Sequence, residues 1–387
     1  MKTNKIFKNI LSLLTLGLVV FSCSKPSEDP KEGQNLKALD LVVTSLKFEK
    51  AKNLKETNVS EFYEKLFITR TPARDKNKTK TDSETDNGYP AMFSIETADI
   101  VGDSIINIKL PFNSKFTNLT GKASATATIT FKSAAQGVKL GETTINGTTA
   151  DITFEVPTTE LTKEKLSAAS TKKVFRFTKP GATPTDAPSV KEYTVVLKFS
   201  ETKSDLCTIE QDAFGFVVNT ATSGAANLTA SFRSVNSTAK AAGDKVFAHY
   251  VTGNSSKRGS SKTDAIEFEL RKGKDATTAG DSANGELVAT TGATASQYFK
   301  ADALKLPDGA YIEVGKTACP TTATGNKIIC DSVNPITGNT SSSTDGQQLK
   351  IYSSTATDAH SYMFTVVAQD GTTKKYYKLT INANAPS

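Results

Sequence analysis

Short runs of alternating apolar and polar residues, bounded by turn-forming residues, recur along this chain of 387 residues. Because successive side chains of a strand point to opposite faces, such runs predict β-strands with one buried face. A series of many short strands is typical of a β-sandwich. The clearest runs lie at residues 125–131, 150–156, 173–177, 246–251 and 349–352.

Helix signals are sparse by comparison. Residues 60–67 are the best candidate, because their apolar side chains are spaced for one helical face and Ser60 is suited to cap the first turn. The chain has no Trp, and 20 Phe with 10 Tyr supply its aromatic bulk. We therefore expect an all-β fold, in a chain long enough for about two domains that each bury a core.

Four short segments of the first half have counterparts in the second half, in the same order. Residues 43–53 match residues 209–219, with a central Phe in each at an offset of 166 positions. The other pairs are Ile106–Leu110 with Ile266–Leu270, Lys139–Leu140 with Lys305–Leu306, and Tyr193–Phe199 with Tyr362–Ala368. The nearly constant offset favours a tandem duplication. It predicts one β-sandwich repeat at residues 38–203 and a second at residues 204–387.

The C-terminal segment predicts a β-hairpin. Asp370-Gly371 supplies the residues that a tight turn needs, and aromatic and aliphatic residues alternate on both sides of it. The residues of the expected core face are Tyr362, Phe364, Val366, Tyr377, Leu379 and Ile381.

This hairpin resembles a known family. The residues that carry the resemblance are Val366, Ala368, Asp370, Gly371, Tyr377 and Ile381. They are similar to the final hairpin of cadherin-like, immunoglobulin-like sandwich domains that occur in tandem in surface lipoproteins of the Bacteroides group. Phe364 and Leu379 depart from the family pattern, and the first repeat lacks an Asp-Gly turn after Phe199. The resemblance implies two tandem immunoglobulin-like β-sandwich domains and display at the cell surface, without a defined activity.

The N-terminus has the features of a signal peptide. Lys2, Lys5 and Lys8 precede an apolar run from Ile10 to Phe21. At ~1.5 Å per residue this run reaches about 18 Å, less than the ~30 Å hydrocarbon core, so a permanent transmembrane helix is disfavoured. The run ends at Cys23, in a pattern that resembles the lipobox of bacterial lipoprotein precursors.

That resemblance implies cleavage before Cys23 and acylation of its side chain, for example with palmitate. Residues 1–22 are then a lipoprotein signal peptide, and the polar residues 23–37 are a flexible tether. Residues 24–29 are similar to the surface-export tags of Bacteroides-group lipoproteins, or are simply part of the solvated tether. The expected location is the outer membrane, lipid-anchored and facing the cell surface.

Charge argues against nucleic acid as a partner. Residues 1–22 contain three Lys and no acidic residue, so their removal lowers the formal net charge from +7 to +4. A net charge of this size, spread over the chain, does not indicate a nucleic-acid-binding protein, which would have Lys and Arg clustered on one face. Two loops have compositions of their own, at residues 70–88 and 255–262, and we expect both to be mobile.

The basic residues of the first loop suggest two alternatives, a polyanion-binding site and a solvated surface loop. We expect the solvated loop, because nearby acidic residues neutralise most of the positive charge. The basic residues are Arg70, Arg74, Lys76, Lys78 and Lys80, and the acidic ones are Asp75, Asp82, Glu84 and Asp86.

Three cysteines follow Cys23. Cys319 and Cys330 bracket a short segment between strand-like runs, so a hairpin would bring them together as a disulfide, which stabilises such a loop by ~3 kcal/mol. Without a neighbouring His they are poor metal ligands. Cys207 stands alone and is expected to be a small buried residue.

The chain has few groups for acid–base or metal chemistry. Its only histidines are His249, expected on a packed strand face, and His360, expected in a loop before the last hairpin. Neither belongs to a catalytic motif, and we assign no catalytic, cofactor-binding or metal-binding residue. A pair of carboxylates would suffice for a glycosidase, so that class stays open. Several aromatic residues are suited either to core packing or to stacking on a ligand, namely Tyr298, Phe299, Tyr311, Tyr352, Tyr376 and Tyr377.

The sequence thus predicts a lipid-anchored surface protein without catalytic activity that acts in binding or adhesion. Its partners would be the membrane, through Cys23, and a glycan or a protein of a host or neighbouring cell. The alternatives are glycan capture within a polysaccharide-uptake system and a carboxylate-dependent glycoside hydrolase.

Overall fold

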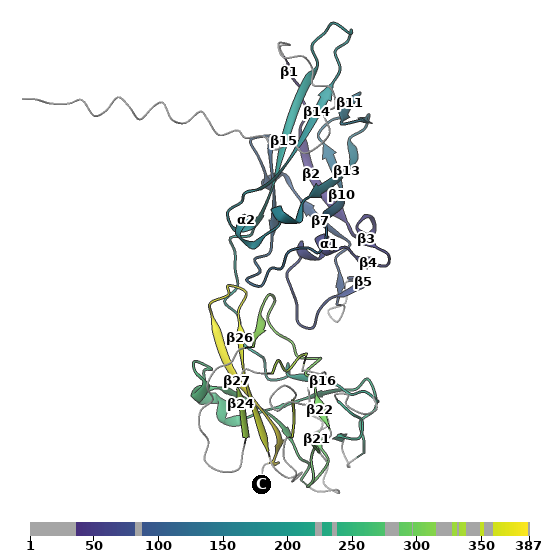
Figure 1. Ribbon diagram of the computed structural model, residues 1–387. Helices are drawn as coiled ribbons and strands as arrows, with labels where there is room; N and C mark the ends of the chain where they lie inside the picture. The colour runs from purple at the N-terminus through teal and green to yellow at the C-terminus, as the bar shows by residue number, and fades with distance from the viewer. Residues whose placement is uncertain are drawn as a thin grey trace, which may run out of the picture.

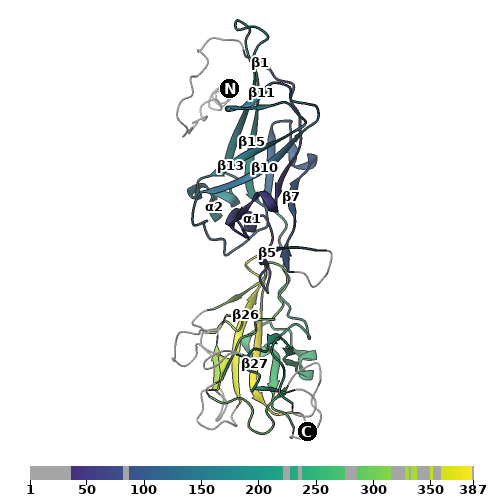
Figure 2. The ribbon, with the colours of Figure 1, turned by 90° about the vertical axis from the view of Figure 1, so that its right-hand side faces the viewer.

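The computed structural model describes residues 36–81, 87–220, 227–233, 238–274, 286–295, 297–314, 327–330, 333–337, 349–351 and 359–385. Strands predominate in these residues, and their only α-helices are α1 (Glu61–Lys65) and α2 (Lys163–Ser167), so the predicted all-β fold is confirmed. Buried apolar side chains form one large cluster between Leu41 and Phe199 and another between Cys207 and Ile381. We call residues 36–203 the first half and residues 204–385 the second half. Figures 1 and 2 show the two halves stacked end to end.

The first half is a sandwich of a seven-stranded and a four-stranded sheet. The larger sheet contains β1 (Lys37–Ala38), β8 (Ile100–Val101), β9 (Ile105–Leu110), β11 (Val138–Leu140), β12 (Thr143–Ile145), β14 (Thr171–Lys179) and β15 (Ser189–Phe199). The smaller sheet contains β2 (Val43–Glu49), β7 (Met92–Ile95), β10 (Ala123–Phe131) and β13 (Thr149–Val156). The sheets pack face to face, since the ring centroids of Phe131 on β10 and Phe177 on β14 are 5.7 Å apart.

Strand β10 shows why these sequences form half-buried strands. Ala123, Ala125, Ala127, Ile129 and Phe131 are all buried, and the residues between them are at least partly exposed. The two-residue period of the sequence therefore matches the two faces of the sheet. Each large side chain removed from water on the inner face contributes roughly 1.5–3 kcal/mol to stability.

The second half is built on one six-stranded sheet. Its strands are β19 (His249–Tyr250), β20 (Ile266–Arg271), β23 (Tyr311–Glu313), β24 (Lys327–Cys330), β26 (His360–Val367) and β27 (Lys374–Ala383). Three strand pairs complete this half: β16 (Gly215–Val217) with β18 (Lys245–Phe247), β17 (Phe232–Arg233) with β21 (Glu286–Leu287), and β22 (Tyr298–Phe299) with β25 (Leu349–Lys350). Phe214 joins them to the sheet, because its ring lies 5.7 Å from that of Phe364 and 5.8 Å from that of Phe216.

Short elements make most of the remaining connections. Two further strand pairs lie in the first half: β3 (Leu54–Lys55) with β4 (Asn58–Val59), and β5 (Asp75–Thr79) with β6 (Gly88–Tyr89). The 3-10 turns are η1 (Lys50–Lys52), η2 (Thr97–Asp99), η3 (Thr158–Glu160), η5 (Thr252–Ser256) and η6 (Lys262–Asp264). The predicted helix at residues 60–67 is present as α1, and its Ser60 hydroxyl accepts a hydrogen bond from the backbone N–H of Tyr63.

The two main sheets share one five-strand arrangement. The order β11-β14-β15-β9-β8 in the first half is matched by β23-β26-β27-β20-β19 in the second. In each sheet the third and fourth of these strands run parallel, and the other neighbours are antiparallel. This common order supports the duplication, while the boundary at residues 203 and 204 stays a prediction.

The match of Tyr193–Phe199 with Tyr362–Ala368 is wrong. Strand β15 contains Tyr193 and pairs in parallel with β9, and the strand that makes the equivalent parallel pairing in the second half is β27. Tyr193 therefore corresponds to Tyr377. Both strands of the C-terminal hairpin alternate in the same way, so the sequence pattern did not distinguish the first strand from the second.

Strand pairing corrects two further matches. Val195 pairs with Ile106, and Leu379 pairs with Phe268, so Ile106 corresponds to Phe268 rather than to Ile266. A slip of two residues keeps the same face inward, which is why alternation does not reveal it. Lys305 and Leu306 lie outside the strands, and the true counterpart of β11 is β23.

The predicted C-terminal hairpin is present as β26 and β27, with Phe364 opposite Tyr377. All residues of β26 are buried, however, and not only those of the expected core face. Its second face is covered in part by the segment at residues 255–262 and by the turn that follows. Met363 packs against Ala265, and the backbone N–H of Tyr376 donates to the carbonyl of Gly259.

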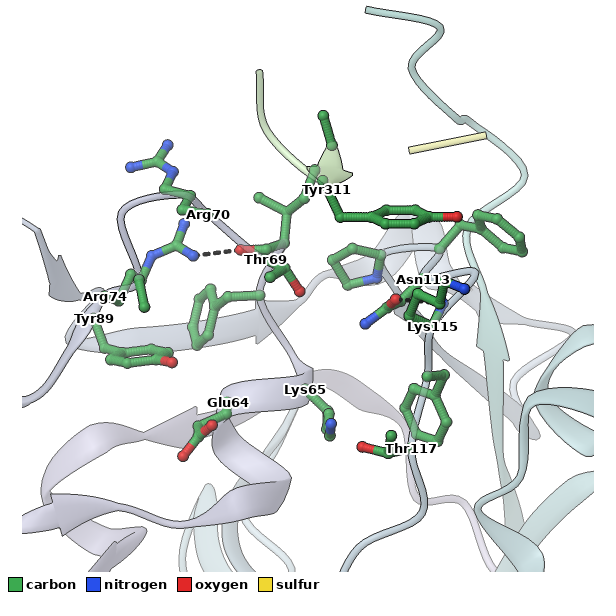
Figure 3. Close-up of a pocket in the computed structure, with 18 of the residues that line it drawn as sticks. Glu64, Lys65, Thr69, Arg70, Arg74, Tyr89, Asn113, Lys115, Thr117 and Tyr311 are labelled. Atoms are coloured by element: carbon green, nitrogen blue, oxygen red, sulfur yellow. Dashed lines mark hydrogen bonds between the residues drawn. The ribbon is translucent and has the colours of Figure 1, made fainter. Parts of the chain in front are cut away.

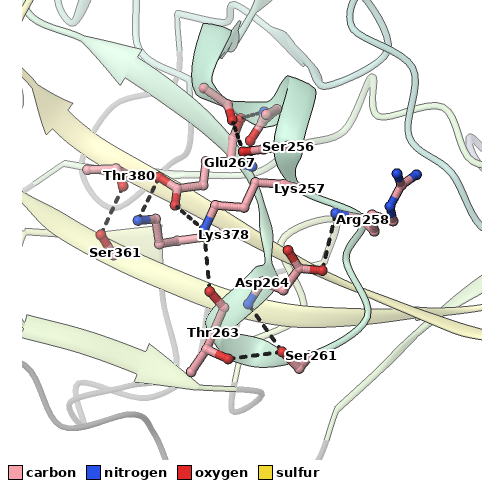
Figure 4. A network of polar contacts seen from close by, with 12 residues as sticks. Ser256, Lys257, Arg258, Ser261, Thr263, Asp264, Glu267, Ser361, Lys378 and Thr380 are labelled. Atoms are coloured by element: carbon pink, nitrogen blue, oxygen red, sulfur yellow. Dashed lines mark hydrogen bonds and ion pairs between the residues drawn. The ribbon is translucent and has the colours of Figure 1, made fainter.

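Residues 255–262 are therefore tied to the hairpin, although half of them are exposed, and their mobility stays a prediction. Figure 4 shows the polar network that organises them. The Asp264 carboxylate accepts hydrogen bonds from the backbone N–H groups of Arg258 and Ser260 and from the Ser260 hydroxyl. The segment is rich in Ser, Lys and Gly because these residues form tight turns here, and composition alone did not separate that use from disorder.

Candidate functional site

The structure describes only part of the predicted lipidation and disulfide sites. Cys23 and Cys319 lie outside the described residues, and for Cys330 only the backbone position at the end of β24 is described. Acylation of Cys23 and the Cys319–Cys330 disulfide stay predictions. Cys207 is a buried free thiol, 2% exposed, as predicted, and burial raises its pKa.

Both histidines belong to strands of the second half. His249 is buried at the start of β19, opposite Glu269, as the sequence predicted. His360 is also buried, and it begins β26 opposite Ile381 rather than lying in a loop. Among the described residues, no three His, Cys, Asp or Glu side chains form a group suited to a metal ion.

A cleft lies where the two halves meet (Figure 3). It has a volume of about 390 Å³ and is open to solvent. We call it the junction cleft. The first half contributes the end of α1, residues 67–76, Tyr89 and residues 111–117, and the second half contributes residues 309–311.

A buried lysine holds one wall of the junction cleft in place. Lys50 is 7% exposed, and its ammonium donates to the carbonyl of Asn77 and to the hydroxyl of Thr79, at 3.1 and 3.0 Å. These contacts tie β5 to the first-half core. Residues 70–81 are thus a connection tied to the core at these two points. Residues 76–81 are exposed, as expected for a solvated loop, and their mobility stays a prediction. Their abundant charged and polar residues reflect exposure on one side of this connection.

Contacts between the halves fix the cleft from both sides. The Arg70 guanidinium binds the Asp308 carboxylate as a fork, with Nε–Oδ1 and Nη2–Oδ2 distances of 3.0 Å. Beside it, the backbone N–H of Gly309 donates to the carbonyl of Thr69, at 2.8 Å. Such a bidentate pair adds orientation to charge attraction.

A second contact of this kind is made by Gln369, which is 5% exposed. Its amide oxygen accepts from the backbone N–H of Ser204 at 2.9 Å, and its amide nitrogen donates to the carbonyl of Phe112 at 3.1 Å. It therefore links β26, the chain connection between the halves and the 111–117 wall of the cleft. A Cβ added at Gly309 would lie 2.6 Å from the Gln369 side chain, so a larger residue at position 309 would displace it.

The lining of the junction cleft is strongly cationic. It has one carboxylate, Glu64, against five basic side chains, which are Lys65, Arg70, Arg74, Lys76 and Lys115. Glu64 pairs with Lys76, and Asp308 pairs with Arg70. The other three cations each lie over an aromatic ring: Lys65 over Phe116 at 5.1 Å, Arg74 over Tyr89 at 5.7 Å and Lys115 over Tyr311 at 5.3 Å.

Arg74 is the most enclosed of these cations. One terminal nitrogen donates to the carbonyl of Ile68, while its Nε is buried and has no hydrogen-bond partner among the described residues. Burial, and then the nearby Arg70, lowers the pKa of Arg74. Burial likewise raises the pKa of Tyr89, beneath the guanidinium, to about 12.

Sequence reasoning noticed parts of this site without assembling it. It identified the basic residues of 70–80 and expected the neighbouring acids to neutralise them, and it identified Tyr311 as an aromatic residue that packs or stacks. Asp75 does pair with Lys78, at 3.3 Å, but not with Arg74. Lys65 and Lys115, which are 50 positions apart, gave no local signal because only the fold brings them to one cleft.

Comparisons of the chain with family models, curated proteins and solved structures found no match. None of the helices in the described residues has the length and apolarity that a membrane crossing needs.

Proposed function

We propose that this chain is a lipid-anchored, non-catalytic binding protein of the outer bacterial surface, with two tandem immunoglobulin-like domains, and that the junction cleft is its ligand site. The observation that carries the proposal is the cleft itself. It is open, it is held by contacts from both halves, and it presents three cations, Lys65, Arg74 and Lys115, that form no ion pair among the described residues. Preorganised polar groups in a concave site are the usual design of a binding site.

The N-terminal segment supports the surface location. The lipobox pattern ends at Cys23, and the described chain begins at residue 36, just before β1. Strand β1 pairs with the start of β15, whose other end leads toward the second half. At ~3.3 Å per residue, the 11 residues of β15 span about 35 Å. A lipid anchor at Cys23 would therefore hold the first half near the membrane and extend the junction cleft away from it.

The test is to block the cleft without disturbing the fold. Thr117 is exposed and lines the cleft, so Thr117→Trp should fill it, and Thr143→Trp places the same bulk on the exposed edge strand β12. Both variants are compared with the parent for binding to glycan arrays, extracellular matrix proteins and whole cells. Loss of a binding signal in Thr117→Trp alone supports the proposal. A signal that survives in both variants places the ligand elsewhere and contradicts it.

A further inference from the structure

Three cations of the junction cleft are prepared for an anion that the chain itself does not supply. Lys65, Arg74 and Lys115 have no carboxylate partner among the described residues, whereas Arg70 and Lys76 have one each. The cleft thus keeps unpaired positive charge in a hollow with apolar walls. Charges in such a place attract anions more strongly than they would on a flat surface.

The aromatic rings hold these cations rather than offering themselves to a ligand. The ammonium groups of Lys65 and Lys115 lie over the rings of Phe116 and Tyr311, and a cation–π contact is worth ~0.5–1 kcal/mol at exposed sites. Each ammonium therefore needs less ordering when a ligand arrives. A nucleobase that stacked on either ring would have to compete with the cation already there.

Arg74 supplies the most specific indication. A buried N–H without a partner costs free energy, and its presence in a native structure requires an explanation. Arg74 lines the cleft together with Lys65 and Lys115; its Nη1 is already used by the Ile68 carbonyl, and its Nε is enclosed by the surrounding atoms. An oxyanion in the cleft would balance the charge of this guanidinium, and a small movement of the side chain would let it accept from Nε.

We infer that the junction cleft binds an acidic polysaccharide through carboxylate or sulfate groups carried along its chain. Figure 3 shows Lys65, Arg74 and Lys115 at separate points around the cleft, so the cleft suits several anionic groups in series rather than one small anion. The inference rests on the proposed function, because a surface-displayed protein meets such polymers outside the cell.

The probes are dextran sulfate, polygalacturonate, neutral dextran and a single-stranded oligonucleotide of matched length. The full mature chain is titrated with each of them at low and at high salt. We expect both acidic polysaccharides to bind, with affinity that falls as salt rises, and neutral dextran not to bind. Tighter binding of the oligonucleotide than of either acidic polysaccharide would overturn the inference in favour of a nucleic-acid site.

Charge reversal within the cleft supplies the decisive comparison. Lys65→Glu and Lys115→Glu should each weaken polysaccharide binding about tenfold, the effect of losing one charge-assisted contact. Lys65→Arg should retain binding. Lys172→Glu changes the net charge equally at an exposed position of β14 and should have little effect. Equal losses in Lys172→Glu and Lys115→Glu would mean that net charge alone is responsible, and the site would be refuted.

A variant that adds net positive charge beside the cleft should have the opposite effect on polysaccharide binding, and it tests the inference independently. Asp308→Asn removes the partner of Arg70 and leaves a fourth unpaired cation beside the cleft, so polysaccharide binding should tighten about threefold. No change or a loss of affinity, in a variant whose hydrogen-exchange protection at the Gly309 N–H matches the parent and whose junction is therefore intact, would contradict the role of the cations.

The outcomes also separate this inference from the proposed function. If arrays identify a neutral ligand whose binding Thr117→Trp abolishes, the cleft is a binding site but the inferred ligand class is wrong. If acidic polysaccharides bind and neither Thr117→Trp nor the lysine variants change their affinity, both proposals fail.

Discussion

Tyr193 and Tyr377 make the same contact in the two halves. The Tyr193 hydroxyl donates to the carbonyl of Leu41 at 2.9 Å and accepts from the N–H of Val43 at 3.0 Å. The Tyr377 hydroxyl donates to the carbonyl of Cys207 and accepts from the N–H of Ile209, both at 2.9 Å. Each tyrosine thereby fixes the first segment of its half to the last long strand of that half. Burial is the largest influence on both hydroxyls, and it raises their pKa.

Removing either hydroxyl should destabilise its own half. Tyr193→Phe and Tyr377→Phe each leave a buried backbone N–H and carbonyl without a partner, which costs ~1–3 kcal/mol. Urea unfolding followed by hydrogen exchange should show faster opening around residues 41–43 in the first variant and around residues 207–209 in the second. Tyr250→Phe is the control, since Tyr250 is only partly buried and its hydroxyl makes no such pair of contacts among the described residues. Identical effects at both segments in every variant would contradict the assignment.

Asp370 should titrate abnormally in the hairpin turn. Burial acts to raise its pKa, but hydrogen bonds from Thr372 and Thr373 outweigh this effect and lower the pKa to about 2. Since the unfolded value is ~3.9, the folded state is favoured above about pH 4, and this contribution is lost as pH falls toward 2. Thr373→Val should raise the pKa seen in carboxyl NMR titration, whereas Thr143→Val should not. An unchanged Asp370 titration in Thr373→Val would show that the side-chain bond does not matter.

At the scale of elements, the tip of the β26–β27 hairpin forms part of the junction between the halves. The Asp370 N–H donates to the Ser204 carbonyl at 3.0 Å, and a Cβ added at Gly371, which has φ +79°, would lie 2.9 Å from the Cβ of Ser114. Glycine therefore serves both the turn and the close approach of the 111–117 loop. Sequence analysis explained Gly371 by the turn alone.

Loss of the Gln369 side chain should loosen this junction. Gln369→Ala removes the acceptor for the Ser204 N–H and the donor to the Phe112 carbonyl, so both groups lose a buried partner. We expect hydrogen exchange at Ser204 to accelerate at least about tenfold and the free energy of unfolding to fall by ~1–3 kcal/mol. Gln211→Ala, at an exposed position, is the matched control. Unchanged protection of Ser204 in the first variant would show that the junction does not depend on Gln369.

For the whole molecule, membrane attachment depends on the predicted lipid anchor. Cys23→Ser should move the protein from the membrane to the soluble fraction, because a single acylated residue would provide the attachment. Fractionation of cells expressing each form gives the measurement, with Cys207→Ser as the control for loss of a thiol elsewhere. Membrane retention of the Cys23→Ser protein would refute the anchor.

The predicted disulfide between Cys319 and Cys330 can also be tested in the whole chain. Peptide mapping without reduction should recover Cys319 and Cys330 in one cross-linked peptide pair, and Cys207 as a free thiol. Free thiols at both positions would exclude the disulfide.

Short-range sequence patterns were sufficient to predict strands and a helix, but they did not predict which strands pair or in which register. Alternation predicted β10, β26 and β27, and capping by Ser60 predicted α1, because these signals depend on residues a few positions apart. The register between strands was not predictable to within two residues, since a slip of two preserves the buried face. Tyr193 was matched to Tyr362 instead of Tyr377 because both strands of the C-terminal hairpin alternate in the same way.

The sequence by itself determined that this chain is all-β, because periodicity and turn chemistry are local properties. It also supplied the lipobox pattern, whose chemical role remains to be tested. The tertiary structure alone decided which charges meet. It brought Lys65, Arg74 and Lys115 into one cleft and assigned Asp308 to Arg70, 238 positions away. Such long-range placement follows from how two packed cores join, and no short segment of the sequence contains it.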